Sequence, residues 1–99
     1  MSTADEENQA ADAAAGMQTP PATFEFLIHT LFTQALMALG RIPNPITKQS
    51  LRNLPTARHF IDTLDMLEAK TAGNLNTDER RLLEEIQHQL RTLFIEAQR

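Results

Sequence analysis

Glycine and proline residues divide most of the chain into three stretches with helical periodicity. Gly40, Pro43 and Pro45 separate the first stretch from the second, and Gly73 separates the second from the third. Within each stretch, apolar residues recur at the three- and four-residue spacings of an amphipathic helix. A chain of 99 residues has room for one small domain. We therefore predict a single all-α domain over residues 23–99, built from a helix, a long loop and a helical hairpin.

The first predicted helix covers residues 24–39. Thr23 is a suitable N-cap, and Gly40 supplies the left-handed residue with which helices commonly end. Apolar side chains occupy about half of the circumference of this helix. Phe26 and Met37 lie close together on the opposite side, which is otherwise lined by Thr and His. We therefore expect this helix to bury two faces.

The second and third helices are predicted to form an antiparallel hairpin. Asn53 caps the second helix, with Pro55 tolerated in its first turn, and Gly73 ends it. Either Asn76 or Thr77 caps the third helix, and the short connection forces the two helices to run antiparallel. The predicted buried stripe of the second helix comprises Leu54, Ala57, Phe60, Ile61, Leu64 and Leu67.

The connection over residues 40–52 is long and contains three large apolar residues. Ile42, Ile46 and Leu51 predict a loop that packs against the core instead of a free linker.

The third helix carries a regular apolar seam with alternating three- and four-residue spacing. The seam consists of Leu83, Ile86, Leu90, Leu93 and Ala97. Such a small domain is only marginally stable on its own, and these apolar faces exceed what we expect three isolated helices to bury. We therefore predict self-association, with a two-fold symmetric dimer favoured. The alternative is a monomer in which residues 40–52 cover the exposed strip. The predicted interaction residues are Phe26, Met37, Leu83, Leu90 and Leu93.

The charge of the chain is concentrated in its first residues. Residues 1–22 contain four acids and no base, whereas residues 23–99 contain nine acids and nine bases. The first segment has almost no large apolar residues, so we predict a disordered acidic tail over residues 1–22. Because the remainder is neutral overall, we expect neither a nucleic-acid footprint nor a polybasic membrane patch.

Several functional classes are disfavoured by what the sequence lacks. There is no cysteine, so thiolate metal sites and cysteine nucleophiles are excluded. No secretory signal and no apolar run long enough for a membrane span are visible, which makes a soluble cytoplasmic protein the expectation. Glu85 and His88 have the Glu-x-x-His spacing of di-iron helices, but both point away from the seam. We expect no metal, no cofactor and no enzymatic activity.

The pattern of residues at several positions along the chain resembles that of a known family. They include Gln34 to Gly40, Ala57-Arg58, Ile61-Asp62, Leu67-Glu68, the segment Lys70-Thr71-x-Gly73-Asn74-Leu75, Leu82-Leu83 and Leu90-Arg91. Together they resemble the short bacterial proteins grouped as domain of unknown function 1844, over roughly residues 24–94. Phe94 stands where these relatives have a Tyr, which is a mild departure. The resemblance implies a bacterial, all-helical protein and supplies no activity.

The most specific part of that resemblance is the predicted hairpin tip, formed by Lys70, Thr71, Gly73, Asn74 and Leu75. These residues are either a polar recognition corner or a structural closure in which Gly73 ends the helix and Thr71 or Asn74 satisfies its free carbonyls. We favour the structural interpretation.

Two functional hypotheses remain after these exclusions. The first is a non-catalytic interaction or assembly module that self-associates, or docks on another protein, through apolar helix faces. The alternative is a regulatory accessory protein that contacts nucleic acid or a nucleic-acid-bound complex, although the neutral charge makes nucleic acid the weaker partner.

Overall fold

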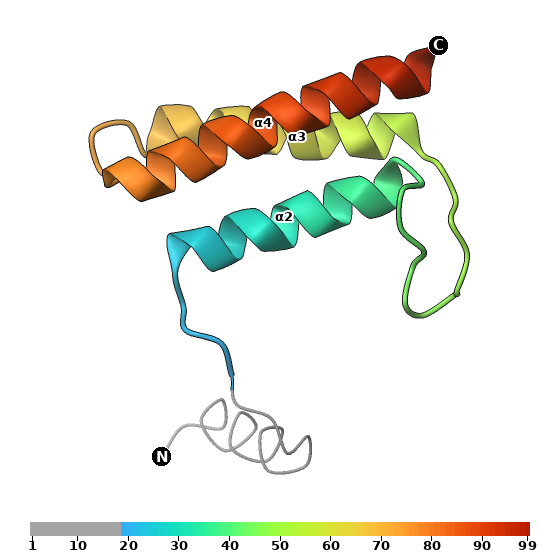
Figure 1. Cartoon of the computed structure of the whole chain (residues 1–99), viewed down its shortest axis with the longest axis horizontal. Helices are drawn as coiled ribbons and strands as arrows, with labels where there is room; N and C mark the ends of the chain where they lie inside the picture. The colour runs from blue at the N-terminus through green and yellow to red at the C-terminus, as the bar shows by residue number, and fades with distance from the viewer. Residues whose placement is uncertain (1–18) are drawn as a thin grey trace.

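The computed structural model describes residues 19–99 and contains three helices, α2 (Phe24–Ala38), α3 (Leu54–Lys70) and α4 (Thr77–Gln98) (Figure 1). None of the described residues forms a β-strand. The predicted all-α fold of helix, long loop and helical hairpin is therefore confirmed. The tail predicted over residues 1–22 lies outside the described residues up to residue 18, and residues 19–22 lead into α2 without regular secondary structure.

Each helix begins at a capping residue that the sequence had identified. The side-chain oxygens of Thr23 and Asn53 each accept a hydrogen bond of 3.1 Å from the backbone N–H three residues further on. At α4 the cap is Asn76, and its side chain and that of Glu79 exchange hydrogen bonds of 2.8 Å with each other's backbone N–H. These bonds satisfy backbone donors that a helix cannot satisfy internally.

Two glycines end the first two helical segments. Gly40 and Gly73 have φ angles of +75° and +84°. These angles are unfavourable for residues that have a Cβ atom. Helix α2 ends at Ala38, one residue earlier than predicted, with Leu39 as its C-cap. The same Ala38 carbonyl accepts a 2.7 Å hydrogen bond from Asn53 N–H, so the two ends of the long loop are joined directly.

The core lies between all three helices, because each helix packs against both others. Leu83 and Leu90, predicted to contact a second chain, have no exposed surface and belong to this core. This corrects their assignment. The apolar seam of α4 faces both α2 and α3, so Leu83 and Leu90 are buried within a single chain. The buried residues are Ile28, Ala35, Ala38, Leu39, Ala57, Ile61, Leu64, Leu83, Ile86 and Leu90.

The loop does not pack against the core along its length. Ile46 is 87% exposed and Leu51 is 70% exposed, whereas Ile42 is partly buried. The expectation that all three residues would pack against the core was therefore wrong for two of them. The loop is held by polar contacts instead: Asn44 Oδ1 accepts bonds from the backbone N–H groups of Ile46 at 2.8 Å and Thr47 at 3.3 Å.

Candidate interaction surface

The remaining predicted interaction residues lie in two different places. Phe26 is 49% exposed on the outer side of α2, and Met37 lies partly buried one residue before the end of the same helix. Leu93 is a partly buried residue of α4 that packs against the core. The structure thus leaves Phe26 and Met37, both on α2, as the members of the predicted set outside the core cluster.

The outer side of α2 is notable for its lack of charge. Glu25, in the first turn, is the only Asp, Glu, Lys or Arg residue in the helix. A shallow hollow of about 270 Å³ on this side is lined by Phe26, His29, Thr30, Thr33 and Gln34. The Thr30 hydroxyl donates a 3.0 Å hydrogen bond to the Phe26 carbonyl, so its donor is already satisfied within the helix. Covering this surface requires little desolvation of charged groups.

The side between α3 and α4 has a different, charged character. The Asp65 carboxylate accepts a 2.9 Å hydrogen bond from the Gln87 amide and a second hydrogen bond from the Arg91 guanidinium. Gln87 is only 2% exposed, and no buried side-chain polar atom of the described residues lacks a partner. This network explains how α4 places a polar residue in its buried face.

The two residues with the spacing of di-iron ligands lie on the solvent side of α4. Glu85 and His88 are both exposed on α4. Within residues 19–99, no group of three His, Cys, Asp or Glu side chains is placed to hold a metal ion.

At the hairpin tip, the backbone and one hydroxyl close the end of α3. The Thr71 hydroxyl and backbone N–H donate to the Leu67 carbonyl at 2.6 and 2.9 Å, and the Asn74 N–H donates to the Thr71 carbonyl at 2.9 Å. Leu75 is partly buried and packs against the core. Lys70 and the Asn74 side chain remain exposed. The geometry therefore assigns a structural task to Thr71, Gly73 and Leu75.

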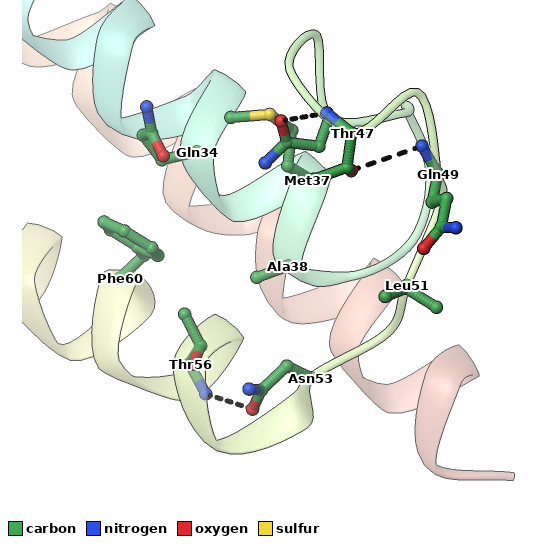
Figure 2. Close-up of a pocket in the computed structure, with 10 residues that line it drawn as sticks. Gln34, Met37, Ala38, Thr47, Gln49, Leu51, Asn53, Thr56 and Phe60 are labelled. Carbon is green, nitrogen blue, oxygen red and sulfur yellow. Dashed lines mark hydrogen bonds between the residues drawn. The ribbon is translucent and has the colours of Figure 1, made fainter.

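A larger hollow lies at the other end of the bundle, where α2 ends and α3 begins (Figure 2). It has a volume of about 340 Å³. Its lining comes from α2, the loop and α3: Gln34, Met37, Ala38, Asn44, Thr47, Gln49, Leu51, Asn53, Thr56 and Phe60. The sequence reasoning missed this hollow because it placed Leu51 against the core.

All of the lining residues fall within a stretch of sequence that contains no acid. Residues 26–61 hold four cations, Arg41, Lys48, Arg52 and Arg58, and neither Asp nor Glu. The net charge of residues 23–99 is zero, so the sum did not reveal that this stretch is basic. The net charge of successive windows along the sequence would have revealed it.

In the part of the chain that the structure describes, no helix is both long and apolar enough to cross a membrane.

These features define a small three-helix domain with an uncharged outer side of α2 and, adjoining it at Gln34, a hollow beside the long loop. The chain belongs to the family described as Domain of unknown function (DUF1844), whose profile matches residues 21–96. The resemblance noted from the sequence is thereby confirmed. No curated protein and no solved structure matches the chain.

Proposed function

We propose that this protein is a non-catalytic interaction module that self-associates through the outer side of α2. The observation that carries the proposal is the uncharged helix side around Phe26, where an aromatic ring is half exposed among threonines. Surface helices normally carry charged residues on their solvent side. A helix that keeps one exposed side without Lys, Arg or Asp is suited to burial against another chain.

The gain from covering Phe26 is large enough to matter. A Phe side chain presents about 200 Å², and 49% of this residue is exposed. Burying the remaining ~100 Å² contributes about 2.5 kcal/mol at ~25 cal/mol per Å². A two-fold axis doubles the effect, because the same ring is covered on both copies. Thr30 and Thr33 are small enough to let a second helix approach closely.

Regulation through nucleic-acid contact is the weaker candidate. The cations of residues 26–61 favour it, but Arg41 is paired with Glu96 at 2.9 Å and Arg58 with Asp62 at 3.0 Å. Affinity for nucleic acid rises with the number of phosphates that free cations neutralise. Lys48 and Arg52 alone give a small footprint.

Sedimentation equilibrium of the full chain tests the proposal, with Phe26→Glu as the perturbing variant. We expect the unmodified protein to form dimers and Phe26→Glu to weaken dimerisation by more than about tenfold, since ~1.4 kcal/mol corresponds to a factor of ten. The new carboxylate lies in the first turn of α2, where the helix dipole favours it, so the fold should be retained. Circular dichroism checks that retention.

Met66→Glu is the matched control, because Met66 is 47% exposed on α3. It introduces the same charge at a similarly exposed apolar residue on another helix and should leave dimerisation unchanged. A protein that remains monomeric up to millimolar concentration would contradict the proposal. Equal weakening by both variants would contradict the assignment of the surface to α2.

A further inference from the structure

The hollow beside the long loop lies in the basic part of the domain. Lys48 and Arg52 alternate along the loop with lining residues, since Thr47, Gln49, Leu51 and Asn53 all line the hollow. Both cations are exposed, and neither has a carboxylate partner within ion-pair distance among residues 19–99. Each cation is a direct neighbour of two lining residues, and at about 0.1 M salt the Debye length of ~10 Å lets such flanking charges attract an anionic segment to the hollow.

The walls of the hollow are apolar or polar without charge, and Lys48 and Arg52 flank it as neighbours of lining residues on the loop. Figure 2 shows Leu51 on the loop and Phe60 on α3 around the space, with Ala38 of α2 between them. The loop wall is fixed by its own hydrogen bonds, including Asn44 N–H to the Gln49 carbonyl at 2.9 Å. Its ends are pinned where Asn53 N–H meets the Ala38 carbonyl. The hollow is therefore preformed, and it suits a segment that combines carboxylates with small or flexible apolar side chains.

The same chain contains a segment with that chemistry. Residues 1–18, which precede the described part, contain Asp5, Glu6, Glu7 and Asp12 and no base. Ala4 adjoins the acidic trio and Met1 lies four residues before Asp5, and methionine adapts readily to irregular apolar surfaces.

The segment is long enough to reach the hollow. It joins the domain at the start of α2, and the hollow lies at the other end of this helix. Helix α2 has 15 residues and spans about 22 Å at ~1.5 Å per residue. Residues 8–18 separate the acidic trio from the described part, and an extended chain of ~3.3 Å per residue gives these residues a reach of roughly 36 Å. Covalent attachment also raises the effective concentration of the segment at the hollow, to about 1 mM for a short tether.

We propose that the acidic segment at residues 1–18 docks in the hollow between α2, the long loop and α3 of its own chain, with Asp5, Glu6 and Glu7 opposite Lys48 and Arg52. This contact differs from the self-association surface around Phe26, since the two linings have only Gln34 in common. It gives the acidic segment a binding partner within the molecule, and it makes the hollow inaccessible to other acidic peptides while the segment is bound.

Paramagnetic relaxation in the full chain tests this proposal directly. The protein has no native cysteine, so Thr3→Cys provides a single attachment point for a nitroxide next to the acidic trio. At low salt we expect strong broadening of the amide signals of Met37, Leu51 and Phe60, and none at the hairpin tip. At about 1 M salt, where the Debye length is ~3 Å, the broadening should be lost.

Charge reversal provides the matched variants. Lys48→Glu/Arg52→Glu should abolish the broadening around the hollow. Lys70→Glu/Arg81→Glu reverses two exposed cations at the hairpin tip and the start of α4, at the opposite end of the bundle, and should leave it unchanged. Because all four residues are exposed, neither pair of substitutions disturbs the core.

Three results would overturn the proposal. The first is an absence of broadening at the hollow in low salt. The second is broadening that persists in Lys48→Glu/Arg52→Glu. The third uses spin-labelled chains without ¹⁵N mixed with ¹⁵N-labelled chains without a spin label. Suppose the amide signals around the hollow broaden as strongly in this mixture as in a chain that carries both labels. That result would show that the segment binds a second copy. Failure of dimerisation in the sedimentation experiment affects none of these readouts.

Discussion

The polar network between α3 and α4 allows a quantitative test of how this domain tolerates a buried amide. Gln87 is 2% exposed, and its Nε2 donates to Asp65 Oδ1 at 2.9 Å. Substitution Asp65→Ala removes that acceptor and also the ion-pair partner of Arg91. The Gln87 amide then remains in the core without its acceptor.

The expected loss of stability follows from these two contacts. Leaving a buried donor unsatisfied costs about 1–3 kcal/mol. The ion pair contributes less, because the Arg91 and Asp65 side chains are 50% and 42% exposed and exposed pairs are worth about 0–1 kcal/mol. We expect Asp65→Ala to lower the free energy of unfolding by about 2–3 kcal/mol in total. For a domain of this size, each kcal/mol corresponds to a decrease in Tm of ~4–8 °C.

The decisive comparison is the double variant Asp65→Ala/Gln87→Leu. Leucine removes the donor, so the second substitution should recover about 1–2 kcal/mol. The difference between this effect and that of Gln87→Leu alone is the coupling energy of the double-mutant cycle. Urea titrations followed by circular dichroism give the four free energies, since the chain has no Trp or Tyr for fluorescence. Additive effects of the two substitutions would refute the reasoning, because they would show that the Gln87 amide does not depend on Asp65.

Further predictions concern the core and the helix ends, each measured by urea unfolding. Leu64→Ala, at a residue with no exposed surface, should cost about 2–5 kcal/mol, whereas Met66→Ala on the outer side of α3 should change stability by less than about 0.5 kcal/mol; similar losses would contradict the burial pattern. Gly73→Ala should cost about 1–2 kcal/mol through its φ of +84° alone, since nothing lies within 4 Å of an added Cβ, and Gly73→Asn should cost less. Asn76→Ala removes the capping box and should cost about 1 kcal/mol; an unchanged stability would show that water replaces the cap.

The helix ends could be predicted from the sequence because they depend on local chemistry. Thr23, Asn53 and Asn76 each satisfy a backbone donor three residues further on, and a capping side chain needs no distant partner to do so. Gly40 and Gly73 similarly adopt backbone conformations that their own lack of a side chain permits.

The distribution of apolar surface could not be predicted because it depends on how the helices are arranged. The seam of α4 was interpreted as a surface for another chain, but a helix that faces two neighbours needs a broad apolar side, and Leu83 and Leu90 fill it. The same arrangement buries most of the wide apolar side of α2, and Leu27 stays 44% exposed. Conversely, Ile46 and Leu51 are apolar yet exposed, because loop hydrogen bonds centred on Asn44 hold the chain away from the core.

The mutual packing of the three helices has a consequence for how the domain opens. Since α2 contacts both members of the hairpin, removal of any one helix uncovers apolar surface on both of the others. Amide protons in the middle of α2, α3 and α4 should therefore exchange with solvent through a common global opening, not helix by helix. A protease that cuts only the opened chain would then face the same opening free energy at sites in all three helices.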